Sequence, residues 1–282
     1  MRNTALLTSL AMIAFAANSV LCRFALGGGH IDAASFASVR VMSGALALAA
    51  IVLYRSEGQV PRDADWRAAL ALFVYMAFFS FAYLSLGAGT GALVLFGAVQ
   101  LTMFIVALRS GEAFSVISWV GLLLAIAGLV YLVSPGVTAP DSTGAILMAV
   151  AGIAWGIYSL LGRQAADPTR ATAWNFLLSV PLVAVTSLIF MDQFHANSLG
   201  IALAIASGVL ASGIGYVIWY AALRGLAATS AATVQLSVPV IAAIGGVVLL
   251  SEDLTLRLSI ASAATLGGVA IVLMQRKVRF AD

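Results

Sequence analysis

Four polar side chains stand inside long apolar stretches of this sequence. Three are the amides Asn18, Gln100 and Gln235, and the fourth is the guanidinium of Arg40. An ionisable group at mid-membrane depth is costly and usually functional, whereas an amide can hydrogen-bond to another helix or to a ligand. Arg40 could bridge helix carbonyls and amides, or it could anchor a ligand carboxylate. Each amide could join two helices, or it could hold the polar end of a small zwitterion.

Aromatic side chains accompany these polar groups. Tyr75, Phe79 and Tyr83 follow one another at helical spacing and therefore share one face of a helix. Trp155 and Tyr158 lie deep in another apolar stretch. These rings could pack between helices, or they could line a cavity that holds an ammonium by cation–π attraction and a ring by stacking. The rings expected to anchor the chain at the membrane interface are Trp66, Trp174, Trp219 and Tyr220.

Acidic residues and histidines are placed differently from the amides. All eleven acidic residues and both histidines fall in predicted loops or at the ends of the apolar stretches. A proton relay and an acidic sodium site are therefore not expected. A buried anion that could pair with a permanently cationic ligand is not expected either. We expect no cofactor and no metal ion.

Composition indicates the elements that must position these residues. The chain has 282 residues, of which 62% are hydrophobic and 9% are charged, whereas soluble domains carry about 25% charged residues. A bilayer requires about 20 apolar residues per helical crossing. We therefore expect an all-α polytopic membrane protein with ten transmembrane helices and no soluble domain. The predicted spans are 4–23, 33–54, 67–87, 89–108, 114–133, 142–162, 172–190, 199–222, 227–250 and 256–274.

Basic residues indicate how the chain is oriented. If the ten spans alternate in direction, eleven Lys and Arg residues lie on the side of the two termini, and only Arg23 and Arg257 lie on the other. Cytoplasmic loops carry such an excess, so both termini are predicted to be cytoplasmic. The charge is spread over loops without a basic stripe, so nucleic acid is not an expected partner.

The sequence repeats itself at a spacing of 140 residues. Residues 14–23 align with 154–163, Glu112 aligns with Glu252, and Gly128 with Gly268. Five spans per copy is an odd number, so the second copy must enter the bilayer upside down. Inverted repeats place a site near the midplane, between two bundles that rock against each other. The predicted parts are a first five-helix repeat at 1–134, a linker at 135–141 and a second five-helix repeat at 142–282.

Three features carry a family resemblance: the segment 250–255 before the last span, Trp155-Gly156 in the sixth span, and Arg40 in the second. With them the chain resembles the drug/metabolite transporter (DMT) superfamily, specifically its ten-span members with two EamA-type repeats. It is most similar to the YddG-type aromatic amino-acid exporters. The resemblance implies a central cavity lined by spans 1–4 and 6–9, with spans 5 and 10 set apart. It also implies export of aromatic and other neutral amino acids across a bacterial inner membrane.

The resulting hypothesis is a monomeric amino-acid exporter that works by alternating access, by facilitated diffusion or exchange. A permease for another small metabolite or for drugs remains an alternative. An intramembrane enzyme would need a buried Ser–His or aspartate pair, which the spans lack, so we do not expect catalysis. The residues expected to bind substrate are Asn18, Arg40, Tyr75, Phe79, Tyr83, Gln100, Trp155, Tyr158 and Gln235.

Overall fold

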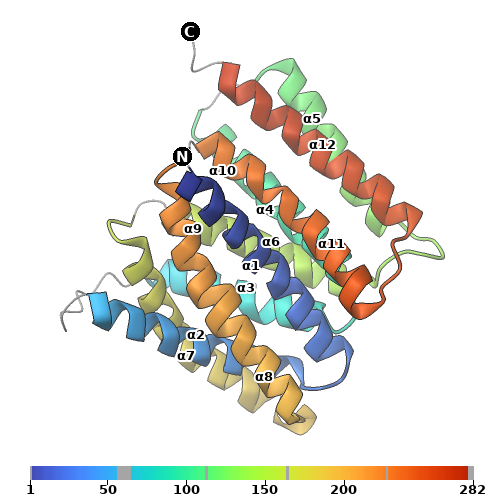
Figure 1. The fold of residues 1–282 in the computed structure, drawn as a ribbon. Helices are drawn as coiled ribbons and strands as arrows, with labels where there is room; N and C mark the ends of the chain where they lie inside the picture. Colours follow the sequence, from blue (N-terminus) through green and yellow to red (C-terminus); the bar gives the residue numbers. More distant parts are fainter. Residues whose placement is uncertain (1, 56–64, 112–113, 163–164, 227, 279–282) are drawn as a thin grey trace.

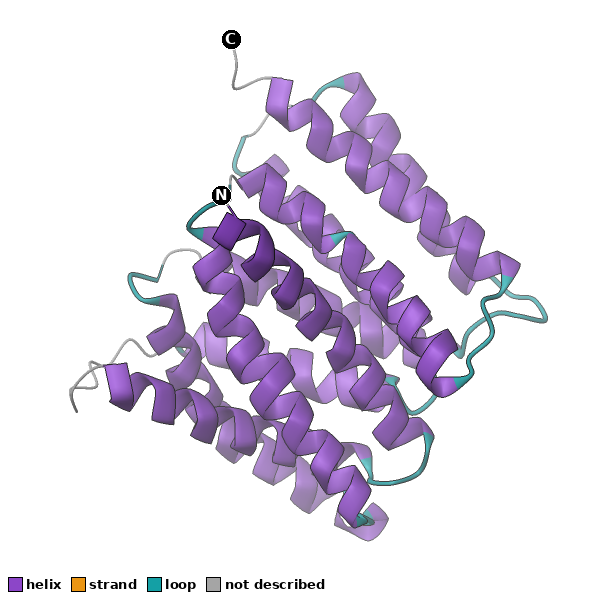
Figure 2. Cartoon of the chain, in the orientation of Figure 1, coloured by secondary structure: helices purple, strands orange, loops and turns teal. Residues whose placement is uncertain are grey.

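A computed structural model describes residues 2–55, 65–111, 114–162, 165–226 and 228–278, and consists there of helices joined by short loops (Figure 2). Glu112 and Arg163, which take part in the repeat, lie outside the described residues. The first half contains α1 (Arg2–Gly27), α2 (Ala33–Arg55), α3 (Trp66–Ala82), α4 (Ala88–Arg109) and α5 (Val116–Val133). The second half contains α6 (Ser142–Gly162), α7 (Pro168–Ile189), α8 (Ser198–Ala206), α9 (Gly215–Leu223), α10 (Ala228–Gln235), α11 (Ser237–Leu250) and α12 (Leu256–Val278).

The expected all-α class is confirmed. Nine helical stretches among the described residues are long and apolar enough to cross a membrane, and α3 is a shorter apolar helix. The predicted span 199–222 corresponds to one stretch, Ser198–Leu223, that contains α8 and α9. The sequence predicted the third span to reach residue 87, but α3 ends at Ala82. The turn that follows it brings Gly87 to the start of α4.

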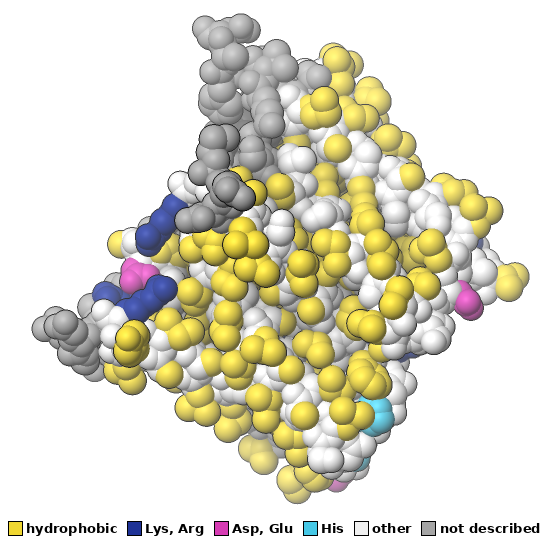
Figure 3. Space-filling model, in the orientation of Figure 1, with side chains coloured by type: hydrophobic (Ala, Val, Ile, Leu, Met, Phe, Trp, Pro, Cys, Tyr) yellow, Lys and Arg dark blue, Asp and Glu magenta, His cyan; other side chains and the backbone are white. Residues whose placement is uncertain are grey.

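Apolar side chains cover the outside of the bundle. The face seen in Figure 3 is largely hydrophobic, and its charged side chains gather at the ends of the helices. Leu46, Leu123 and Val248 are examples of large apolar side chains that are mostly exposed. A surface of this kind is favourable in a hydrocarbon solvent and unfavourable in water.

Local sequence signals explain where several helices begin and end. Asp65 and Asp167 each accept a backbone hydrogen bond at the first turn of α3 and α7, as N-cap residues do. Pro168, which has no N–H to satisfy, follows directly as the first residue of α7. At its C-terminal end, α11 is capped by Ser251, whose φ of 54° lies in the left-handed region that often terminates helices.

Helices α5 and α12 form a pair that is set apart from the rest (Figure 1), as the family resemblance implied. They run antiparallel, because Gly121 lies against Gly268 while Gly128, about two turns further along α5, lies against Thr265, which precedes Gly268. Thr265 also donates a hydrogen bond to the carbonyl of Ala125 at 3.4 Å. Small residues let the two backbones approach, which is how helices associate in lipid.

Two membrane-length stretches are irregular at mid-length. Between α8 and α9, residues Ser207–Ile214 wind as a π-helix, a form that is frequent at functional sites. Between α10 and α11, the helix breaks at Leu236, three residues before Pro239. Pro239 frees a backbone carbonyl there, because proline lacks the N–H that would bond four residues back.

The bundle has two distinguishable ends. At the N-terminal end, α1 begins beside the loop after α9, where Gly225 lies against Thr4. At the far end, Asp32 after α1 accepts a hydrogen bond from the backbone N–H of His195, which precedes α8, at 3.2 Å. Figure 1 shows both chain termini at the same side of the molecule.

Candidate functional site

A cavity of about 470 Å³ opens among α4, α6, α9 and α10, with α5 and α12 closing one side. The family resemblance implied a lining from spans 1–4 and 6–9 alone, so the contribution of α5 and α12, the fifth and tenth spans, corrects that expectation. It reaches Ser110 at the end of α4 and Leu223 at the end of α9, so it extends to the N-terminal end of the bundle. Its volume lies within the range of ligand pockets. Among the described residues, the wall contains no charged side chain.

Three of the residues predicted to bind substrate line this cavity: Gln100, Trp155 and Gln235. Gln100 is 8% exposed, and its Nε2 has no hydrogen-bond partner in the described part of the chain. The amide of Gln235 makes one long bond, from Nε2 to the carbonyl of Ala231 at 3.5 Å. Both amides can therefore bond to a ligand without breaking a strong bond within the protein.

The sequence missed four aromatic residues of this wall. Phe104 lines the cavity from α4, and Tyr216, Trp219 and Tyr220 line it from α9. Trp219 and Tyr220 were expected to be interface anchors, but Trp219 is only 7% exposed and Tyr220 is half-buried. The repeat contained a usable signal, because Trp219 stands 140 residues after Phe79, which the sequence did single out.

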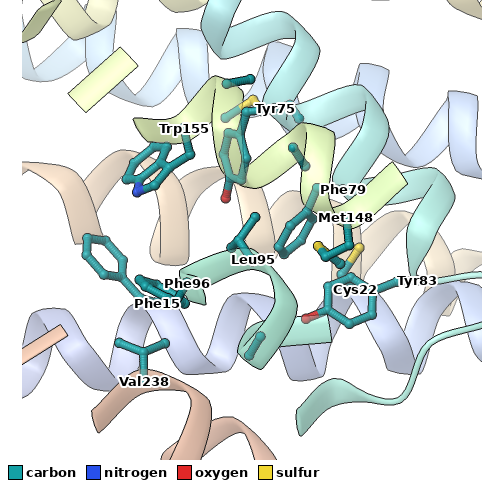
Figure 4. Close-up of a cluster of buried hydrophobic side chains, with 14 of the residues drawn as sticks. Phe15, Cys22, Tyr75, Phe79, Tyr83, Leu95, Phe96, Met148, Trp155 and Val238 are labelled. Carbon is teal, nitrogen blue, oxygen red and sulfur yellow. The ribbon is translucent and has the colours of Figure 1, made fainter. Parts of the chain in front are cut away.

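Three other predicted residues meet Trp155 deeper in the bundle. Asn18, Tyr75, Phe79 and Trp155 line a void of only about 20 Å³, which is room for about one water molecule. Figure 4 shows the rings of Tyr75, Phe79 and Trp155 converging there from α3 and α6, with Phe15 of α1 opposite. Trp155 belongs to both spaces, so it separates the large cavity from the small void.

The barrier between the two spaces is made of rings in contact. Trp155 lies 4.8 Å from Tyr75 and 5.1 Å from Tyr216, measured between ring centroids. Phe15 meets Trp155 and Tyr216 edge-on, at 6.3 and 5.9 Å. Each such pair contributes about 0.5–1.5 kcal/mol beyond its area burial. Contacts between rings therefore stabilise the barrier in this conformation.

The remaining predicted residues lie outside both spaces. Tyr83 is fully buried, and its hydroxyl donates to the carbonyl of Ala88 at 3.3 Å. Tyr158 is also buried, and its hydroxyl donates to Oγ1 of Thr172 on α7 at 3.1 Å. In this conformation, both residues join helices.

Arg40 is fully buried on α2, next to the void. Its Nη2 donates to the hydroxyl of Tyr75 at 3.0 Å, and its Nε donates to Oγ of Ser212 at 3.3 Å. The guanidinium carbon lies 4.9 Å from the ring centroid of Phe79 and 5.3 Å from that of Tyr75. Its Nη1 has no hydrogen-bond partner among the residues that the structure describes.

An ion pair lies at the far end of the bundle. Arg23 of α1 donates from Nε to Oε1 of Glu252 at 3.0 Å, and its Nη1 donates to the carbonyl of Tyr83 at 3.3 Å. The other carboxylate oxygen, Oε2, accepts from the backbone N–H of Ala88 at 2.8 Å, at the start of α4. One salt bridge therefore joins α1, the α3–α4 connection and the loop before α12.

Membrane-length apolar helices around a ligand-sized chamber define a multi-pass helical membrane protein. The chain belongs to the EamA-like transporter family, whose model matches residues 2–134 and 142–274. It is 50% identical over 280 residues to the uncharacterized protein PA1977 of Pseudomonas aeruginosa, covering 99% of this chain and 98% of that one.

Two further proteins are similar to this chain. The threonine/homoserine exporter RhtA of Salmonella typhimurium is 28% identical over 145 residues, which is 49% of this chain and 48% of RhtA. A protein of known crystal structure superposes with a TM-score of 0.68 at 23% identity, covering 96% of this chain and 98% of that one. The second likeness establishes the fold.

Proposed function

We propose that this protein exports amino acids, aromatic and other neutral ones, across a bacterial inner membrane by alternating access. The cavity combines two amides with a wall of rings, which suits a zwitterion with an uncharged side chain. A relative that aligns with 49% of this chain is a threonine/homoserine exporter. The similarity to YddG-type exporters belongs to the same proposal.

One observation carries the alternating-access mechanism: the open cavity and the collapsed void occupy repeat-equivalent positions. Phe15, Ser19, Phe79 and Leu95 line the void, and Trp155, Ser159, Trp219 and Gln235 line the cavity. Each residue of the second set stands 140 positions after its counterpart in the first. An inverted duplication whose halves exchange conformations would open the void as it closes the cavity.

The antiparallel packing of α5 and α12 supports the inversion. These helices hold equivalent places in the two halves, since Ala125 and Thr265 are 140 residues apart and are bonded to each other. Equivalent residues that meet across antiparallel helices lie near a two-fold axis perpendicular to those helices. The repeats would then be 1–134 and 142–282, with the excess of basic residues placing both termini in the cytoplasm.

Export in this orientation means that the open cavity takes substrate from the cytoplasm. The ion pair between Arg23 and Glu252 closes the periplasmic end in this conformation. Facilitated diffusion or exchange is the proposed mode, because the described cavity wall offers no carboxylate to carry a proton.

Exchange in proteoliposomes tests the proposal. Vesicles loaded with labelled threonine, phenylalanine, methionine or tryptophan should release label faster when the unlabelled amino acid is outside, and a protonophore should not change the rate. Protein-free vesicles give the background. Release no faster than that background for all four amino acids would refute amino-acid export.

A permease for apolar drugs or another metabolite is the second candidate, because the described wall carries rings and no charged side chain. A growth-inhibition panel of amino-acid analogues, nucleobases and dyes separates the two. Protection by the protein against amino-acid analogues supports export of amino acids, whereas protection only against dyes or nucleobases supports the alternative.

A further inference from the structure

Arg40 is a cation without a partner anion among the described residues. It is completely buried, and its hydrogen bonds go to two neutral hydroxyls, those of Tyr75 and Ser212. Neutral acceptors and ring faces offset only part of the cost of holding a charge away from water. The free Nη1 adds a donor that no described atom accepts. A structural arginine would be expected to satisfy that donor.

The surroundings of Arg40 are built to aim its guanidinium. The π-helical segment Ser207–Ile214 brings Ser212 to Nε on one side, and α3 brings Tyr75 to Nη2 on the other. Tyr75 also accepts from Nδ2 of Asn18 at 3.4 Å, while Oδ1 of Asn18 accepts from Ser207 at 2.6 Å. A continuous chain of hydrogen bonds thus runs from the guanidinium to the wall of the void.

We propose that Arg40 is the carboxylate-binding residue of the transport path, engaged when the void opens. The proposal rests on the amino-acid export proposed above, and it makes the carboxylate the recognised group. Nη1 and Nη2 form a fork that matches the two oxygens of a carboxylate. Tyr75 holds Nη2 in the empty state, and a substrate carboxylate replaces that hydroxyl as the acceptor.

This assignment gives the two spaces different tasks. The cavity at the N-terminal end, whose described wall has no charge, admits the substrate by its rings and amides. The void lies beyond Trp155 and next to Arg40, so the carboxylate meets its cation only after the aromatic barrier opens. Compounds that fit the cavity but lack a carboxylate would then enter without completing the cycle.

Ligand binding to the purified protein tests the carboxylate directly. Thermal unfolding is measured with phenylalanine, with phenylalaninamide, and with 3-phenylpropionate, which has a carboxylate but no amine. We expect stabilisation by phenylalanine and 3-phenylpropionate, with the amide binding about tenfold or more weakly. Equal stabilisation by phenylalanine and its amide would overturn the proposal, whatever happens to any variant.

Substitutions assign the effect to this side chain. Arg40→Met should abolish the preference for the carboxylate, and Arg40→Lys, which keeps the charge but loses the fork, should retain a reduced preference. Arg257→Met is the control, because it removes a cation that bonds carbonyls at the end of α5, far from the void. A preserved preference in Arg40→Met would contradict the assignment, and so would its loss in Arg257→Met.

The transport measurement and the binding measurement test the two proposals independently. If the wild-type protein exchanges none of the four amino acids, the proposed function is wrong, while carboxylate-dependent stabilisation that Arg40→Met removes still establishes the site. If exchange occurs but phenylalaninamide is exchanged with the same KM as phenylalanine, the transporter stands and the role of Arg40 is refuted.

Discussion

Gln100 lines the cavity, and its buried amide nitrogen has no hydrogen-bond partner among the described residues. A buried donor left without an acceptor is costly, so its presence in a cavity wall favours a ligand as the missing acceptor. The neighbouring residue Val99 stands where the second repeat has Pro239. Because α4 has no such proline, it continues unbroken past Gln100 and holds its amide at a fixed place.

Replacing Gln100 by leucine should weaken substrate binding at this position. The loss of one neutral hydrogen bond, about 1 kcal/mol, predicts a rise in KM of about fivefold with little change in Vmax. Exchange kinetics in proteoliposomes measure both constants. Ser179→Ala is the control, since its hydroxyl donates to the carbonyl of Ala69 outside the cavity. An unchanged KM in Gln100→Leu would show that the amide does not touch the substrate.

Depth along a helix was predictable from the sequence, but the direction of a side chain was only partly so. Trp155 and Tyr158 stand within one turn of each other, yet the first lines the cavity and the second bonds to Thr172 on α7. Trp219 was missed because its position near the end of a span suggested the interface. The packing of neighbouring helices decides these orientations. A segment that is hydrophobic on all sides has no periodic pattern from which that packing could be predicted.

At the scale of elements, glycines set the distance between α5 and α12. A Cβ added at Gly268 would meet the backbone oxygen of Gly121, and it would lie 2.6 Å from the backbone nitrogen of Ala125. A Cβ added at the preceding residue, Gly267, would meet nothing within 4 Å. We therefore expect opposite effects on stability from a side chain added at these two positions, because one faces a backbone and the other faces open space.

Gly268→Ala should destabilise the protein by about 1–3 kcal/mol, because the backbones must separate to admit a methyl group. Gly267→Ala should leave stability unchanged or raise it by up to about 1 kcal/mol, through the better helix propensity of alanine. Thermal unfolding of the detergent-purified variants compares the two. Equal effects of both substitutions would contradict the close crossing.

A proline accompanies one of the two irregular elements. Pro239 follows the break at Leu236 between α10 and α11 by three residues. The π-helical segment in the eighth span was not expected, because none of its residues Ser207–Ile214 is a proline. Close contact with α2 accompanies that winding: Gly208 lies against the carbonyl of Arg40, and Gly44 lies against that of Gly208. Contacts of this kind depend on the tertiary structure, so they cannot be predicted from the sequence of one segment.

At the scale of the whole molecule, the ion pair between Arg23 and Glu252 holds one end shut. The side chains are 26% and 21% exposed, so water screens the pair and its contribution is modest. Glu252 also accepts from the N–H of Ala88, and its removal leaves that donor without this partner.

Arg23→Ala should shift the population toward the state that is open at the far end. A loss of about 0.5–1 kcal/mol predicts a two- to fivefold larger open fraction. The measurement is the rate at which a thiol reagent labels Ser19→Cys, a position on the void, in a Cys22→Ser background. Asp253→Asn, which removes the exposed neighbouring charge, should leave the rate unchanged. A labelling rate insensitive to Arg23→Ala would remove the pair from the closing mechanism.

The detached pair α5 and α12 makes the chamber sensitive to the lipid around it. Leu122 and Val269 of this pair form part of the chamber wall, yet the pair makes few contacts with the other helices. Acyl-chain packing on its outer side would then press directly on the cavity that we propose to hold the substrate. The transport rate should therefore change with the lateral pressure and the thickness of the bilayer. The mechanical properties of the membrane would then help to determine the flux of substrate.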